Sequence, residues 1–304
     1  MHTELSRGRE TRGVMIPTSI LLGELRSQTV GTAANGGHTV AQQLGSVADR
    51  INRPALKVEG MGATVLRNLT GFLDLPNLAG SGSTSWVAED GAATRSTATF
   101  AKVAMGPKTV TGEYQLSRRL ILQSNEAIED LLRRDLGFLL AQALDAAAIN
   151  GGGSNQPTGI LANSGVDAVT EALEFSDTTA DLIAALEVDD VTGTAGFLTH
   201  PSVMNTCRKI KATDGHVVPL SELFHGQRVE ATTQVPTNLG DDDDKTALIY
   251  GLWSELVIGY WSAVDVLVNP YHADVASKGG ALIHAFLDAD VAVRHVEAFR
   301  YTVL

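Results

Sequence analysis

The residue types that most often carry chemistry are present in this sequence, but their spacing is not that of a catalytic or metal site. Eight histidines are spread over 304 residues, and no two of them form an HxxxH or HExxH pair. The single cysteine, Cys207, cannot build a zinc site with such spacing. As a nucleophile it would need a base nearby, and the sequence offers no argument that His200 is that base. We expect a buried structural thiol and histidines that serve the surface or the core.

Two other segments carry some features of ligand-binding loops. GGGSNQPTG at 151–159 lacks the Lys-Ser/Thr ending of a phosphate loop, and it follows a helical pattern instead of preceding one. The acidic run at 241–244 lacks the alternate spacing and the glycine bend of a calcium loop. No GxSxG elbow is found. We therefore expect a turn and a solvated loop, and a protein that is not an enzyme and has no cofactor or metal.

A long helix is the clearest element, and it directly precedes the glycine-rich turn. Between 124 and 150 apolar residues recur every three or four positions, the period of one helical face: Ile128, Leu132, Leu136, Leu139, Ala143 and Ala147. Ser124 can cap its start, and Gly151 with Pro157 ends it. At 1.5 Å per residue the helix should be roughly 39 Å long.

Before this helix the sequence predicts a long β-hairpin. Strand-like runs at 84–89 and 97–105 flank a polar connection that is opened by Asp90-Gly91. Most of its residues are small or polar, and such a hairpin is barely stable alone in water. We expect it to lie on another surface, such as a neighbouring subunit. A further strand-like run at 109–122 leads into the helix.

The remaining segments indicate an α+β protein. Residues 1–53 are either an extended arm, with a short helix at 19–25, or a disordered tail. After the glycine-rich turn we expect a helix at 178–186, a strand, turn and helix within 194–213, and a strand-rich segment at 247–268. Two strands should follow at the end, one around 283–287 and one around 291–295.

Composition excludes some classes of protein. No apolar run approaches the 18 residues of a membrane span. The net charge of −12 argues against broad binding of nucleic acid through its phosphates, although it does not exclude a protein that encloses nucleic acid. Residues 1–53 sum to +2, so the rest of the chain carries −14.

The order of these pieces resembles the major capsid protein family of tailed phages. After the arm come SWVAEDGAATRSTATFAKVAMGPKTV, SRRLILQS and a helix that ends in INGGGSNQPTGIL. The late segments ALIYGLWSELVIGYWSAVDVLVNPY and AFLDADVAVRHVEAF resemble the C-terminal part of the same family. The resemblance covers roughly residues 54–304.

This resemblance implies an HK-97-type capsid fold. An N-terminal arm would occupy 1–53 and an extended β-hairpin, the E-loop, 79–108. The peripheral P-domain would be formed by 54–78, by 109–165 with the spine helix 124–150, and by C-terminal strands within 268–304. The axial A-domain would span 166–267.

The family also implies a function. Its members self-assemble into hexamers and pentamers of an icosahedral shell around double-stranded DNA, with a portal protein at one vertex. The chain would belong to the virion, be assembled in the host cytoplasm and have no membrane. Scaffolding or decoration proteins are possible partners. No charged coiled-coil scaffolding segment precedes the arm, so we expect either a mature form or a separate scaffold. An encapsulin-like compartment shell is the alternative. A hydrolase or transferase lacks the required constellation of residues.

Five residues are candidate assembly contacts: Trp86, Phe100, Lys102, Arg118 and Arg119. For the two arginines, solvated surface is an equal alternative to inter-subunit salt bridges. Lys102 lies where one member of the family forms a Lys–Asn isopeptide bond. The segment HADVASKGG (272–280) offers no asparagine, and Ser277 lies near the expected place. We therefore expect no covalent cross-link.

Overall fold

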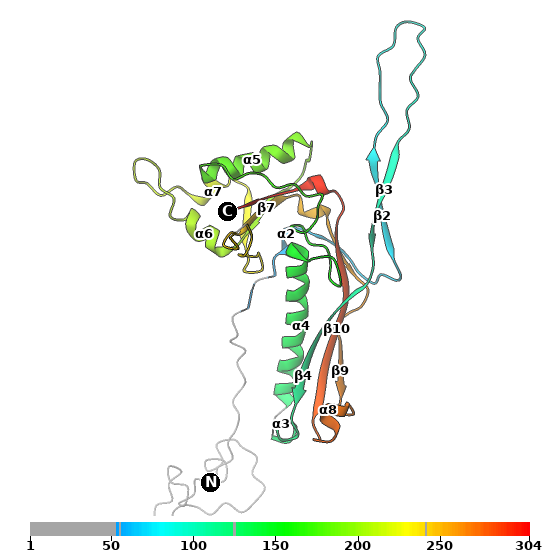
Figure 1. Cartoon of the computed structure of the whole chain (residues 1–304), viewed down its shortest axis with the longest axis vertical. Helices are drawn as coiled ribbons and strands as arrows, with labels where there is room; N and C mark the ends of the chain where they lie inside the picture. Colours follow the sequence, from blue (N-terminus) through cyan, green and yellow to red (C-terminus); the bar gives the residue numbers. More distant parts are fainter. Residues whose placement is uncertain (1–52, 55, 124–125, 241) are drawn as a thin grey trace, which may run out of the picture. The chain divides into compact units, whose positions relative to one another are not determined.

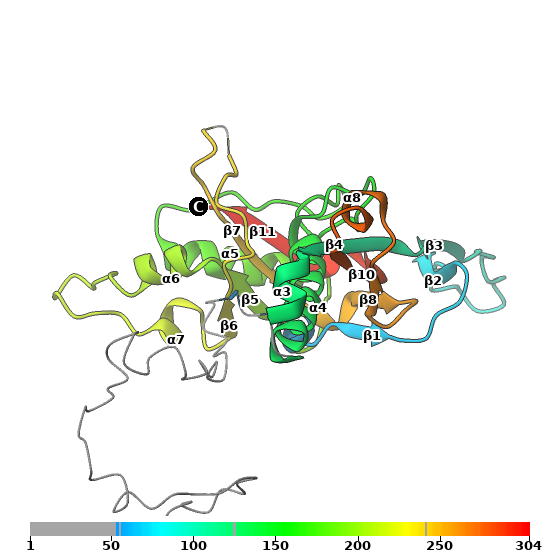
Figure 2. The ribbon, with the colours of Figure 1, turned by 90° about the horizontal axis from the view of Figure 1, so that it is seen from below.

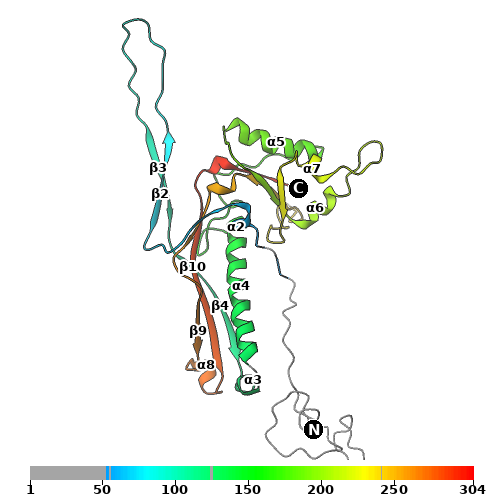
Figure 3. The ribbon, with the colours of Figure 1, turned by 180° about the vertical axis from the view of Figure 1, so that it is seen from behind.

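The computed structural model describes residues 53–54, 56–123, 126–240 and 242–304. The arm up to residue 52, its short helix at 19–25 and the cap Ser124 lie outside these residues. The described part contains helices and three β-sheets, which confirms the α+β class (Figures 1 and 3).

The largest sheet is built around β10 (Ala281–Val293). Along one edge β10 pairs antiparallel with β4 (Lys108–Leu116); along the other it pairs first with β9 (Asp265–Asn269) and then with β8 (Leu256–Tyr260). β1 (Thr64–Leu66) joins β8 in parallel. The prediction of two separate strands, near 283–287 and near 291–295, is therefore wrong. They form one strand, because pairing continues through Asp288 and Asp290.

Helix α4 (Glu126–Asn150) covers one face of this sheet and confirms the predicted long helix. Its buried stripe is Leu136, Leu140 and Leu144, which belong to one core cluster with Ile283 and other residues of β10. Leu139, which was expected on the buried face, is 42% exposed. The leucines at 136, 139 and 140 allow two overlapping stripes, and packing against the sheet selects the one that continues to Leu144.

The glycine-rich stop of α4 is a tight turn, as predicted. The amide of Gly151 donates to the carbonyl of Ala147 at 2.8 Å, and the amide of Gly159 donates to the carbonyl of Gly151 at 2.9 Å. A Cβ on Gly151 would lie 2.2 Å from the carbonyl oxygen of Pro157, so only glycine allows this close approach. The segment forms a turn because the hydrogen bond between Gly159 and Gly151 brings its two ends together.

A second sheet has four strands in the order β11-β7-β5-β6. They are Phe299–Val303, Ala247–Gly251, Gly196–Thr199 and Arg228–Ala231. Helices α5 (Phe175–Val188), α6 (Pro201–Cys207) and α7 (Leu220–Leu223) share a core with one face of this sheet. The predicted helix near 178–186 and the strand, turn and helix within 194–213 are confirmed. The boundary predicted at residue 267, between the A-domain and the C-terminal strands of the P-domain, does not separate the two sheets. β8 and β9 pair with β10 in the large sheet, and β11 pairs with β7 in the smaller one.

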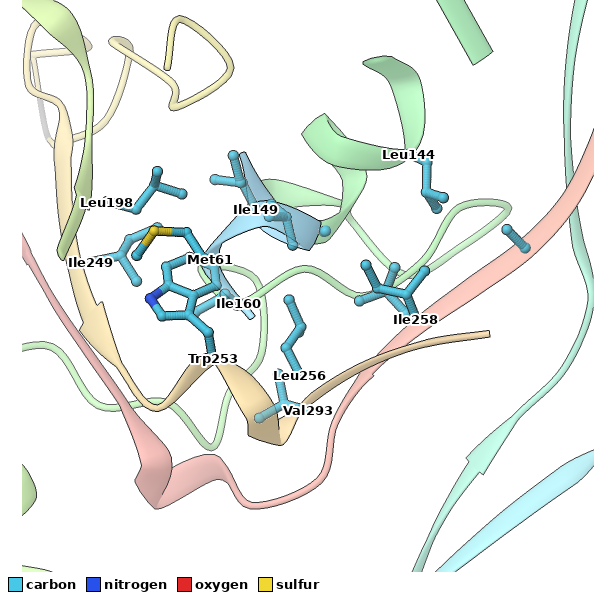
Figure 4. Packing of buried hydrophobic residues seen from close by; sticks show 14 of the residues in the cluster. Met61, Leu144, Ile149, Ile160, Leu198, Ile249, Trp253, Leu256, Ile258 and Val293 are labelled. Carbon is cyan, nitrogen blue, oxygen red and sulfur yellow. The ribbon is translucent and has the colours of Figure 1, made fainter. Parts of the chain in front are cut away.

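One apolar core joins the two sheets around Trp253 (Figure 4). This side chain is 1% exposed, donates its indole N–H to the carbonyl of Gly196 at 2.9 Å, and meets the Phe299 ring edge-on at 5.6 Å. The same cluster contains Ile249 of the smaller sheet and Ile258 of the larger one. The 3₁₀ turn Trp253–Glu255 carries the chain from β7 to β8.

The hairpin is present, but its strands differ from those predicted. β2 (Leu73–Gly80) pairs with β3 (Thr99–Met105), so the predicted strand at 84–89 is wrong and its partner lies earlier in the chain. Residues 81–98 hold no strand, because few apolar side chains there can form cross-strand pairs. Asp90, with φ of 66°, lies in a turn that the amide of Gly91 closes on the carbonyl of Ala88.

The strand expected at 109–122 is also shorter than predicted. β4 ends at Leu116, and α3 (Arg118–Gln123) takes the rest of the segment. The Ser117 hydroxyl accepts the Leu120 amide at 3.2 Å, which satisfies a free N–H group at the start of α3.

Candidate assembly surfaces

A buried carboxylate fixes the returning leg of the hairpin. The side chain of Asp290 on β10 is 5% exposed. It accepts the amide of Gly106 at 3.1 Å, the ammonium of Lys108 at 2.9 Å and the amide of Val291 at 2.9 Å. The junction of β3 and β4 is thereby tied to the central strand of the large sheet.

The outgoing leg is tied to the same sheet by different contacts. The Trp261 indole donates to the carbonyl of Gly71 at 2.6 Å, and the amide of Leu69 donates to the carbonyl of Tyr260 at 3.1 Å. Phe72 packs against Gly106, where a Cβ would lie 2.8 Å from the phenyl ring. Both legs of the hairpin are thus held at its base.

The hairpin itself presents apolar side chains that its own chain leaves uncovered. Trp86 is fully exposed, and Phe100 is 77% exposed. Phe100 pairs across the strands with Leu78, which is 54% exposed. These are the side chains that another molecule could bury.

The other predicted contacts have different surroundings. Lys102 forms an ion pair with Asp74 on the facing strand at 2.6 Å, and both side chains are about half exposed or more. Arg118 and Arg119 are exposed at the start of α3, and within the described residues neither forms an ion pair. Figure 1 shows α3 and the hairpin at opposite ends of the large sheet, so the five residues do not form one site.

A contact that the sequence analysis missed holds the start of the described chain. Asp145 of α4 is 7% exposed and accepts the amides of Val58 at 3.0 Å and Lys57 at 3.3 Å, where α2 (Val58–Met61) begins. Burial raises the pKa of Asp145, and the two amides partly oppose that shift. Lys57 also reaches Glu230 of β6 at 2.7 Å. The sequence held one indication of this contact, because Asp145 directly follows the apolar residue Leu144, which is buried.

The groups suspected of chemistry have structural surroundings. Cys207 is buried, and burial raises the pKa of its thiol to about 11, which keeps it protonated near neutral pH. His200 caps α6 by accepting the amide of Ser202 at its Nδ1, and burial lowers its pKa. In the part of the chain that the structure describes, no three His, Cys, Asp or Glu side chains gather as a metal site. No helix among these residues is both long and apolar enough to cross a bilayer.

Residues 36–304, most of the chain, match the model of the phage capsid family. The chain belongs to this family. It is similar to the major capsid protein of Halomonas phage phiHAP-1, with 30% identity over 297 residues that cover 96% of this chain and 48% of that protein. It is also similar to the major capsid protein of Klebsiella oxytoca phage phiKO2, with 24% identity and coverage of 89% and 69%. The chain thus spans about half the length of the Halomonas phage relative.

Solved capsid structures share the fold. The capsid of a native GTA particle matches with a TM-score of 0.75 and 21% identity, over 91% of this chain and 99% of that one. A chain from Mycobacterium phage Ogopogo matches with a TM-score of 0.69 and 16% identity, over 88% and 98%. The predicted capsid family and the predicted HK-97-type fold are confirmed.

Proposed function

We propose that this chain is the major capsid protein of a tailed phage and assembles into hexamers and pentamers of an icosahedral shell. The observation that carries the proposal is the hairpin. Both of its legs are tied to the large sheet, yet no described part of the same chain covers the side chains of Trp86 and Phe100. A projection that is anchored at its base and has uncovered aromatic side chains is suited to lie on a neighbouring subunit.

The contents and partners of the shell follow from the same proposal. Double-stranded DNA would be enclosed without sequence-specific binding, because the net charge of −12 disfavours phosphate contacts and leaves packaged DNA mobile. A portal protein would occupy one vertex, and scaffolding or decoration proteins would be further partners. The particle would be assembled in the host cytoplasm. Both named relatives are phage major capsid proteins, which favours a phage shell over an encapsulin-like compartment.

Electron microscopy of the purified chain tests the proposal. Unaltered protein should form closed icosahedral shells. The variant W86S/F100S should keep its circular dichroism spectrum, because both side chains are exposed, and should lose shell formation. Leu173→Ser, at a position that is 98% exposed and outside the hairpin, is the matched control and should still form shells. Unaltered protein that remains a small soluble particle under all assembly conditions would refute the proposal.

We further propose that the shell has no covalent cross-links. Lys102 is engaged by Asp74, and the segment at 272–280 offers no asparagine as a partner. Particles boiled in detergent should release the chain at its own mass of 32.1 kDa. A ladder of covalent oligomers on the gel would contradict this.

A further inference from the structure

Helix α5 presents an acidic surface that its own chain does not neutralise. Asp177, Asp181 and Glu187 are exposed, and the helix contains no lysine or arginine. Within the described residues none of the three forms an ion pair. Asp177 and Asp181 are four residues apart, a spacing at which like charges destabilise a helix. Asp177 lies in the first turn of α5, where the helix dipole favours negative charge, whereas Glu187 lies in the last turn, where the dipole disfavours it. The acidic surface therefore has no cationic partner among the described residues.

A basic surface follows α6, and it too lacks partners. Arg208, Lys209 and Lys211 are exposed, and within the described residues none of them forms an ion pair. The segment is ordered by backbone hydrogen bonds of the loop at 210–218, among them the amide of Val218 donating to the carbonyl of Ile210 at 3.1 Å. The carboxylate of Asp214 at the loop tip accepts the amide of His216. The three cations thus project from a defined backbone.

Both surfaces belong to the layer of helices on the four-stranded sheet. α5 contributes Leu182 and Leu186 to the core of this layer, and α6 contributes Val203 and Met204. Figures 1 and 2 show α5 along one side of the layer, while the loop after α6 projects beyond its end. No described ion pair joins the acidic surface to the basic one, so each is available to another molecule.

We propose that the acidic surface of α5 in one subunit docks on the basic segment at 208–211 of the next subunit around a capsomer. This inference rests on the proposed shell function and names one contact within it. A ring needs a heterologous contact, in which one surface meets a different surface of the next copy. Two α5 helices facing each other would oppose like charges, and so would two basic segments. Head-to-tail contact is the arrangement that pairs every charge with its opposite.

The contact contributes more to orientation than to affinity. Exposed ion pairs are individually weak, but complementary charge speeds encounter and suppresses wrong registers. Salt should oppose it, because the Debye length falls from about 10 Å at 0.1 M to about 3 Å at 1 M. The assembly rate of the unaltered chain should therefore fall as sodium chloride is raised over this range.

Charge reversal with rescue tests the pairing. D177K/D181K/E187K reverses the acidic surface, R208E/K209E/K211E reverses the basic one, and a third protein combines all six changes. D242K/D265K/E297K makes the same change in net charge as the acidic reversal, at exposed acids outside both surfaces that form no ion pair among the described residues. Circular dichroism checks folding. Light scattering and electron microscopy measure the lowest protein concentration that gives shells.

Each single-surface reversal should raise that concentration at least about tenfold, and the combined protein should return to within about threefold of the unaltered chain. The control triple should stay within the same threefold. The inference is overturned if both reversals assemble like the unaltered chain, if the combined protein is no better than either, or if salt leaves the unaltered chain's assembly rate unchanged. Failure of the unaltered chain to form any shell would instead refute the proposed function, so the two failures are distinguishable.

Discussion

Replacing Asp290 by asparagine should release the base of the hairpin and destabilise the chain. The carboxylate accepts hydrogen bonds from Gly106 and Lys108 with its two oxygens, at 3.1 and 2.9 Å, and it is nearly inaccessible to water. Asparagine has the same shape but only one accepting oxygen. The side-chain NH₂ group of asparagine would face either the Gly106 N–H or the Lys108 ammonium. An NH₂ group cannot accept a hydrogen bond from either of these donors.

The expected loss follows from the burial of each partner. Removing one member of a buried ion pair costs about 3–5 kcal/mol, and a hydrogen bond to a charged group contributes about 1.5–3 kcal/mol. Lys108 is 28% exposed and can recover part of its hydration, so the lower part of these ranges applies. We expect the free energy of unfolding to fall by about 2–3 kcal/mol.

Urea denaturation of unassembled subunits measures this loss, and hydrogen exchange at the Gly106 amide shows where it arises. Asp74→Asn is the matched control, because Asp74 pairs with Lys102 in the same hairpin but is 49% exposed. Its cost should stay below about 1 kcal/mol. If Asp290→Asn unfolds at the same urea concentration as Asp74→Asn and exchanges Gly106 no faster, the clamp at the hairpin base is not a stabilising contact.

Four other substitutions test α4. Leu140→Ala should cost about 2–5 kcal/mol, whereas Leu139→Ala should cost less than about 1 kcal/mol; equal losses in urea would contradict the buried stripe. Gly137→Ala should stabilise the chain by about 0.5–1 kcal/mol, because an added Cβ meets no atom within 4 Å, and a lower melting temperature would refute this. Burial raises the pKa of Asp145 in the folded chain, so ionisation of this carboxyl group opposes folding. The stability that depends on the protonated carboxyl group is therefore lost as the pH rises from about 4, the value in the unfolded chain, through the raised pKa. Relative to Asp145→Asn, the unaltered chain should therefore lose stability across that range in pH-dependent denaturation, and a constant difference would count against it.

Local patterns in the sequence predicted much of the fold correctly. The period of α4 and its glycine stop are properties of adjacent residues, and both are confirmed. The hairpin was predicted from its turn, but its first strand was placed too late, because pairing depends on a partner strand that the local pattern does not identify. In the same way β10 reads as two strands in isolation and is one strand in the sheet.

The sequence by itself therefore determined the class of the protein, the spine helix, the hairpin turn and the resemblance to the capsid family. Only the tertiary structure decided which leucines of α4 are buried and which carboxylates hold backbone amides. Asp290 and Gly106 are 184 positions apart, and Asp145 and Val58 are 87 apart. Such contacts depend on how the sheet and the helix bring distant segments together. The spacing of residues along the chain therefore does not predict these contacts.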